Sequence, residues 1–341
     1  MKINPTLILS TPLGLFFLVS GWLKAIDPFG GALKIEEYLA ALGLAAFDSY
    51  AMVFSILLCA FEISLGLFLL FGVFRRLTAI AATCMMLAFT ALTAYLAFDP
   101  YVAIQECGCF GEAIDLTNME TFIKNVIILL AVISYSVILF FQPKNSSASI
   151  AAISILIFAI LVPIYSFLFL PPFDFLGFNR GVDLSSNQEL HIYDNKYEDV
   201  TESLLQESNQ VPQLWIVAQH NISKVELETI KSIIEHHQDK YRYMVLSSEN
   251  KQTISNIPQY FVDKVALKEL LRAKSGIVLI DRGVIRGKWN LANLKYDQIK
   301  WQDHVRFRYW LFVAFGFLVI YLTRFKLSPF IKRIRNNYTI K

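Results

Sequence analysis

Charged residues and cysteine are both scarce in this chain of 341 residues. Asp, Glu, Lys and Arg make up 17% of the residues, against about a quarter in soluble proteins, and 55% are hydrophobic. This balance excludes an ordinary soluble protein and indicates that part of the chain lies in lipid. The net charge of +3 comes mostly from a basic tail, which favours contact with anionic lipid over nucleic acid.

The motifs of several enzyme classes are also missing. No phosphate-binding glycine loop, Ser-His-Asp order or paired acid–base motif occurs, and Gly30-Gly31 lacks the preceding strand of a nucleotide loop. All five histidines lie in or beside residues 173–303 without the spacing of metal ligands, and no cysteine follows Cys109. We therefore predict no metal site at these histidines and no nucleic-acid partner.

Six stretches are long and apolar enough to cross a membrane, which takes about 20 residues. The first is not a cleaved signal, because Pro12 interrupts it and no small-residue cleavage site follows. The fold class predicted is a polytopic α-helical membrane protein. Its expected spans are residues 7–24, 51–74, 77–98, 122–141, 150–170 and 309–323.

The orientation of these spans follows from their basic connections, since cytoplasmic loops accumulate Lys and Arg. Arg75 and Arg76 join spans two and three, Lys144 lies between spans four and five, and a basic tail follows span six. We expect a multi-pass protein of the bacterial inner membrane with both termini cytoplasmic. Residues 25–50, residues 99–118 and the long segment after Pro171 are then extracytoplasmic loops.

Residues 173–303 break the hydrophobic pattern and form a soluble domain inserted between spans five and six. A strand over residues 213–218 leads into a capping box, Ser223-x-x-Glu226, and a helix. We expect a second strand over residues 241–247 and a short helix over residues 265–272. A hairpin follows, with strands over residues 276–280 and 284–289 and a turn at Asp281-Arg282-Gly283. This order of elements resembles a thioredoxin fold.

The thioredoxin resemblance lacks the redox residues. Where that family has Cys-x-x-Cys, this chain has Gln219-His220-Asn221-Ile222, and Ser275 replaces the family's proline. Without a thiol the domain cannot exchange disulfides. We expect residues 173–303 to bind an extracytoplasmic protein partner.

The membrane half resembles the DoxX family and its MauE-like relatives. The resemblance rests on Ser20-Gly21-x-x-Lys24 running into Asp27-Pro28, on Glu62-Ile63-Ser64-Leu65-Gly66, and on Cys107-Gly108-Cys109-Phe110-Gly111. It implies a four-helix membrane bundle, extracytoplasmic thiol chemistry, electron transfer linked to a quinone, and maturation of disulfide-rich partners. The predicted division is residues 1–142 for this bundle, 143–172 for span five, 173–303 for the soluble domain, and 304–341 for span six with the tail.

Cys107 and Cys109 are the predicted catalytic residues, because they share an outside loop in an oxidising compartment. Only Gly108 separates them, so their disulfide is strained and suited to donate oxidising equivalents. A structural turn and a zinc site remain alternatives, although this loop contains no histidine. Cys59 and Cys84 lie at different depths, so we expect them to stay unpaired as small packing residues.

Glu62 falls about 16 Å along span two, near the middle of the bilayer, where an ionised carboxylate is costly. We expect it to face the bundle interior and hydrogen-bond Thr90 or Ser134, or to stay protonated. Its role is a proton relay, a contact for a quinone head group, or a plain interhelical bond. Lys24 and Asp27, at the outer mouth of span one, form a local ion pair, or Lys24 snorkels alone.

These residues favour a membrane thiol–disulfide redox protein that acts on an extracytoplasmic partner, with a lipid quinone as its cofactor class. The alternative is a non-enzymatic membrane scaffold in which Cys-Gly-Cys is a structural bridge. A transporter is a third interpretation, for which Glu62 alone offers a charge at depth.

Overall fold

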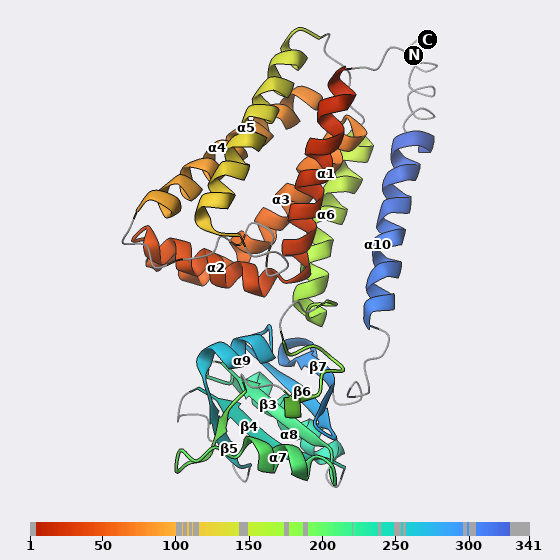
Figure 1. The fold of residues 1–341 in the computed structure, drawn as a ribbon. Coiled ribbons are helices and arrows are strands. Elements are labelled where there is room, and N and C mark those ends of the chain that lie inside the picture. Colours follow the sequence, from red (N-terminus) through yellow and green to blue (C-terminus); the bar gives the residue numbers. More distant parts are fainter. Residues whose placement is uncertain are drawn as a thin grey trace. The chain divides into compact units, whose positions relative to one another are not determined.

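The chain divides into two compact units in the computed structural model, Met1–Ile164 with Trp310–Lys341, and Tyr165–Tyr309. Figure 1 shows the helices of the first unit and the sheet of the second. The described residues are 5–99, 104, 108, 111, 116–142, 149–173, 177–186, 190–219, 221–237, 240–248, 254, 257–295, 299 and 305–327.

Six helices among the described residues are long and apolar enough to cross a membrane, as the sequence predicts. The chain is therefore a polytopic helical membrane protein with a separate mixed α/β domain. The helices are α1 (Pro5–Ile26), α3 (Ala51–Phe71), α4 (Arg75–Phe98), α5 (Asn118–Phe140), α6 (Ser149–Phe169) and α10 (Val305–Tyr321), the last continuing as η5 (Leu322–Leu327).

Residues 25–50 were predicted to be a loop, and this prediction is wrong. They form α2 (Pro28–Ala41), which crosses the end of the bundle in Figure 1, and the 3₁₀-helix η1 (Ala45–Tyr50). Asp27 caps α2 by accepting the Gly30 N–H at 3.0 Å, and Pro28 begins it. Ser55 Oγ of α3 donates to the Pro28 carbonyl at 2.7 Å, which fastens α2 to the bundle.

Helices α1 and α3 approach closely because both carry glycine at their contact. A Cβ on Gly66 would lie 2.5 Å from the Leu18 nitrogen, and one on Gly14 would lie 3.0 Å from the Gly66 oxygen. Such small residues let membrane helices pack backbone to backbone. An apolar cluster that includes Phe17, Leu65, Met86 and Tyr135 then fills the space between α1, α3, α4 and α5.

Basic side chains gather at one end of the helical unit. Arg76 donates to the carbonyls of Phe140, at 3.2 Å, and Gln142, at 2.6 Å, at the end of α5. Arg324 donates to the Phe71 carbonyl at the end of α3, at 3.2 Å. The predicted same-side placement of these two basic segments is thus confirmed, whereas Lys144 and the tail beyond residue 327 lie outside the described residues.

The second unit contains a six-stranded mixed sheet with the order β2-β5-β4-β3-β6-β7. Strand β3 pairs parallel with β4 and antiparallel with β6, which continues into the β6–β7 hairpin. Its strands are β2 (Ile192–Tyr193), β3 (Gln213–Ala218), β4 (Arg242–Ser247), β5 (Gln259–Val262), β6 (Ser275–Asp281) and β7 (Val284–Asn290). The predicted βαβ unit and hairpin are confirmed, and β2 and β5 are additional.

Helices cover both faces of this sheet. Helix α8 (Lys224–His236) packs on one face, while α7 (Thr201–Glu207) and α9 (Lys264–Leu270) pack on the other, and η2 (Leu184–Ser186) and η3 (Leu291–Asn293) are short 3₁₀ turns. Along β3, Leu214 and Ile216 lie in the core between the sheet and α8. Trp215 and Val217 lie in the core on the opposite face, with α7 and α9. This alternation is the period-two pattern of a strand buried on both sides.

Candidate functional site

A buried ion pair joins α1 to α3 inside the helical unit. Lys24 Nζ lies 2.6 Å from Glu62 Oε1, and their side chains are 8% and 1% exposed. Lys24 also donates to Ser20 Oγ, one turn earlier on α1, at 3.0 Å. A charge removed from water is tolerated only when it is paired and hydrogen-bonded, so these contacts explain how both ions persist there.

Gly21 allows this pair to form. A Cβ at position 21 would lie 2.7 Å from Glu62 Cβ and 2.8 Å from the Ile63 nitrogen. Any larger residue would push α1 away from α3 at this level. The Ser20-Gly21-x-x-Lys24 motif thus supplies a hydrogen-bond partner, a close helix contact and the cation in a single turn.

Two further helices complete a small cavity around the pair. Helix α4 contributes Met86 and Phe89, and α5 contributes Lys124 and Asn125. Lys24 Nζ lies 5.6 Å from the centre of the Phe89 ring, and Lys124 Nζ lies 5.9 Å from that of Phe16 on α1, which are cation–π distances. All four bundle helices therefore meet at this site.

Glu62 lines this cavity, and one of its two oxygens has no hydrogen-bond partner among the described residues. This oxygen, Oε2, is buried. The cavity has a volume of about 10 Å³, close to the least that holds one water molecule. A quinone ring does not fit this space.

The structure corrects the expected partners of Glu62 and Lys24. Thr90 and Ser134 donate to carbonyls of their own helices, those of Met86 and Leu130, and Glu62 pairs with Lys24. The burial of Lys24 rules out snorkelling. Asp27, the expected partner of Lys24, accepts the Gly30 N–H as the cap of α2. Glu62 faces the bundle interior, as predicted.

Cys107 and Cys109 lie outside the described residues, but two glycines of their motif are described. The Gly108 N–H donates to Tyr38 Oη of α2 at 3.1 Å. A Cβ on Gly111 would lie 3.4 Å from the Leu23 carbonyl oxygen and 3.7 Å from Lys24 Cα. Gly108 therefore lies beside α2, and Gly111 lies close to the end of α1 that carries Lys24.

The other two cysteines take no part in this arrangement. Both are free, as predicted; Cys59 is buried and Cys84 is exposed. The packing role expected of both therefore describes only Cys59, because Cys84 lies on the outside of α4.

In the second unit, Gln219 and Ser275, the two positions compared with thioredoxin in the sequence, both make hydrogen bonds. Gln219 donates to the Leu271 carbonyl at 2.6 Å, and the Ser275 hydroxyl donates to Glu226. Partial burial alone would raise the pKa of Glu226, but hydrogen bonds from Ser275 and Ser223 outweigh it and lower the pKa. His220 lies outside the described residues.

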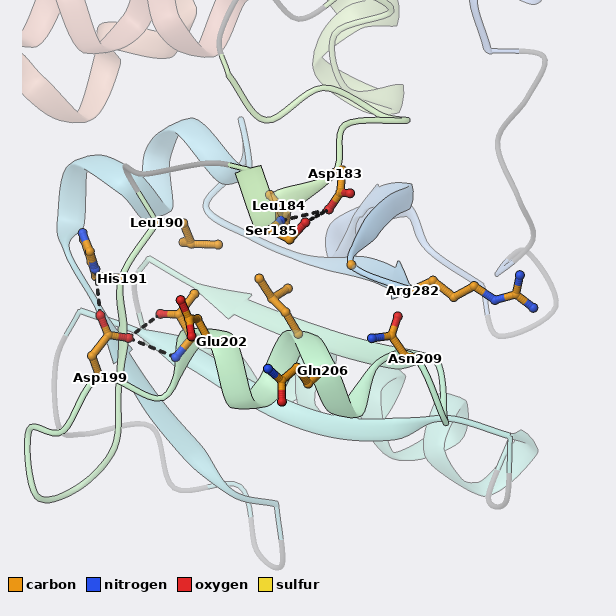
Figure 2. A pocket seen from close by; sticks show the side chains of 13 residues that line it. Asp183, Leu184, Ser185, Leu190, His191, Asp199, Glu202, Gln206, Asn209 and Arg282 are labelled. Atoms are coloured by element: carbon orange, nitrogen blue, oxygen red, sulfur yellow. Dashed lines mark hydrogen bonds and ion pairs between the residues drawn. The ribbon is translucent and has the colours of Figure 1, made fainter.

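The second unit also has a cavity of about 830 Å³ between η2 and α7. Figure 2 shows Glu202, Gln206 and Asn209 along one wall and Arg282 at one end. At the other end His191 Nδ1 lies 2.8 Å from Asp199 Oδ2, and hydrogen bonds from Thr201 are the main cause of a lowered Asp199 pKa. These groups suit a polar ligand. Among the described residues, no three His, Cys, Asp or Glu side chains could hold a metal.

A known protein family matches most of the membrane half. A family model described as methylamine utilisation protein MauE matches residues 4–141. This range contains the whole Lys24–Glu62 site and the Cys-Gly-Cys motif. The MauE part of the expected resemblance is thus confirmed, and the DoxX part stays a prediction.

One similar curated protein is Protein TlpB of Flavobacterium psychrophilum. The two chains are 31% identical over 112 residues, which is 33% of this chain and 30% of TlpB. The chain therefore spans less than a third of that relative's length. No solved structure matches the chain.

Proposed function

We propose that the chain is a membrane thiol–disulfide redox protein in which Cys107 and Cys109 exchange electrons with an extracytoplasmic protein. The observation that supports this proposal is the proximity of Gly111 to Leu23 and Lys24. It places one end of the Cys-Gly-Cys-Phe-Gly motif directly beside a buried, charged site within the range that matches MauE.

The chemistry of the proposed reaction balances in two steps. The Cys107–Cys109 disulfide takes two electrons and two protons from a partner dithiol, which becomes a disulfide. A lipid quinone then takes two electrons and two protons from the reduced pair and leaves as a quinol. The cavity beside Glu62 is too small for the ring, so we place quinone binding elsewhere on the chain.

The second unit serves to recruit the partner in this account. Its strand order, with a parallel β3–β4 pair beside an antiparallel hairpin, supports a thioredoxin-like domain. The absence of cysteine after Cys109 leaves it a binding role. We place this domain outside the bacterial inner membrane and both termini in the cytoplasm, because Arg76 and Arg324 lie at the same end of the helical unit.

Trapping of mixed disulfides tests the proposal. Cys107→Ser or Cys109→Ser, in the full-length protein in its native membrane, leaves one thiol without a resolving partner, so a covalent complex should accumulate. Reductant should dissolve it. Cys84→Ser is the matched control, since Cys84 is exposed and free, and should trap nothing. Single variants that trap nothing and keep full function would contradict the redox role and favour a scaffold.

A further inference from the structure

The large cavity of the second unit lies away from Gln219, where the sequence was compared with the thioredoxin redox motif. Strand β3 pairs with β6 so that Gln213, its first residue, lies opposite Ile280. The turn between β6 and β7 is therefore beside the start of β3, whereas Gln219 follows its end. Because Arg282 and Gly283 of that turn line the cavity, it lies at the opposite end of the strand from Gln219.

Hydrogen bonds join the walls of this cavity to one another. The Gly283 N–H donates to Ser208 Oγ, at 2.8 Å, and the Arg282 N–H donates to the Ser208 carbonyl, at 3.1 Å. The Leu184 N–H donates to the Gly283 carbonyl at 2.8 Å. These bonds link the end of α7, the β6–β7 turn and η2. A cavity with linked walls keeps its shape without a ligand, as most ligand sites do.

Three leucines form the apolar part of the lining. Leu184, Leu190 and Leu205 are 1%, 2% and 6% exposed, so they lie at its buried side, while most of its other side chains are exposed and polar. The volume of about 830 Å³ falls in the range of sites that enclose a drug-sized ligand, and a short peptide has this size. A ligand with both an aliphatic and a polar part matches this lining.

The charged groups of the lining are mainly carboxylates. Hydrogen bonds, chiefly from neighbouring hydroxyl groups, lower the pKa of Asp183 and Asp199, which keeps both ionised at neutral pH. Glu202 is a third carboxylate, whereas Figure 2 shows the Arg282 side chain extending away from the other labelled residues. His191 pairs with Asp199. The polar part of a matching ligand therefore carries positive charge.

Glu202 is the carboxylate that such a ligand can engage directly. The other two accept hydrogen bonds from neighbouring side chains. Within the described part of the chain, no hydrogen bond or ion pair occupies the Glu202 carboxylate, which is exposed. Gln206 and then Asn209 follow it four and three positions later, on the same side of α7 and its end. Their amides can donate to and accept from a peptide backbone.

We propose that this cavity binds a basic side chain of the extracytoplasmic partner, together with the short segment around it. The aliphatic stem of a lysine or arginine packs on the leucines while its cation pairs with Glu202. Gln206 and Asn209 hydrogen-bond the backbone beside it. This inference rests on the proposed function, because it names the feature of the partner that the second unit recognises. A free organic amine carries the same charge and is distinguished below.

Calorimetric titration of the full-length protein, in nanodiscs of zwitterionic lipid, tests the ligand class. The first probe is a tripeptide with uncharged ends and a central lysine, and its control has norleucine in place of the lysine. We expect the lysine peptide to bind at least about fivefold more tightly, the upper range for an exposed ion pair. Salt should reduce this preference. Equal binding of the two peptides would overturn the proposal.

Two charge reversals test the place of binding. Glu202→Lys should abolish binding of the lysine peptide. Glu228→Lys is the matched control, since Glu228 is also exposed, changes the net charge equally, and lies on α8, which covers the other face of the sheet. It should leave binding unchanged. Equal losses in both variants would show attraction to the whole domain and overturn the site. Should Glu202→Lys fail to fold, Glu202→Gln should weaken binding about fivefold.

Two further results separate this proposal from the thiol function. If n-butylamine, which is the lysine side chain alone, binds as tightly as the peptide, the ligand is a free amine and the partner role is wrong. Glu202→Lys, combined with Cys107→Ser, should reduce the yield of trapped mixed disulfides. An unchanged yield contradicts the role of the cavity and keeps the thiol function, whereas peptide binding that needs Glu202 without any trapped complex supports the cavity and contradicts the thiol function.

Discussion

At the scale of single residues, Lys24 and Glu62 depend on each other for burial. Lys24→Met would leave a carboxylate that is 1% exposed without its cation. Breaking a buried pair in this way costs about 3–5 kcal/mol, whereas replacing both charges is often close to neutral. We therefore expect Lys24→Met to lower the thermal midpoint of the full-length protein strongly and Lys24→Met/Glu62→Gln to recover most of it. Additive effects of the two substitutions would contradict a direct pair.

The interior position of Glu62 could be predicted from the sequence, but its partner could not. An ionisable residue deep in an apolar span predicts an interior position, and Glu62 has one. Its partner lies 38 positions away, and only the packing of α1 on α3 brings the two together. The Ser20-Gly21-x-x-Lys24 motif could be recognised in the sequence. That Lys24 is the cation of the pair and Gly21 the close helix contact follows only from the structure.

At the scale of elements, Gly21 sets the separation of α1 and α3. Gly21→Ala places a methyl group within 3 Å of Glu62 and Ile63 atoms, an overlap that typically costs about 1–3 kcal/mol. We expect a lower thermal midpoint, although alanine favours the helix intrinsically. Leu15→Ala, at a side chain 50% exposed on the same helix, is the control and should change little. Equal stability of the two variants would contradict close packing at Gly21.

Elements with strong local signals were predictable, and elements defined by their neighbours were not. The capping boxes Thr117–Glu120 and Ser223–Glu226 begin α5 and α8, and β3 has the bounds predicted. Strand β5 has four residues, three of them half-buried, and exists through pairing with β4 and β2. Helix α2 was missed although Asp27-Pro28 is a common helix start.

At the scale of the whole molecule, the second unit has its own core and should fold alone. That core includes Leu170, which is 2% exposed, and Arg180 donates to the Pro171 carbonyl at 3.1 Å. Residues 170–303 should therefore be more stable to urea than residues 173–303, by about 2 kcal/mol for one buried leucine. Leu170→Ala in the longer fragment is the control and should remove most of this difference. An unfolded longer fragment would show that the helical unit supplies part of the core.

The central claim for the whole molecule is that Cys107 and Cys109 cycle between dithiol and disulfide. The most direct test is thiol alkylation in growing cells, with Cys59→Ser and Cys84→Ser introduced so that only this pair is scored. The account predicts a mixture of oxidised and reduced pairs that shifts towards the dithiol when quinone is depleted. A pair that stays entirely in one state, whatever the quinone supply, would contradict it.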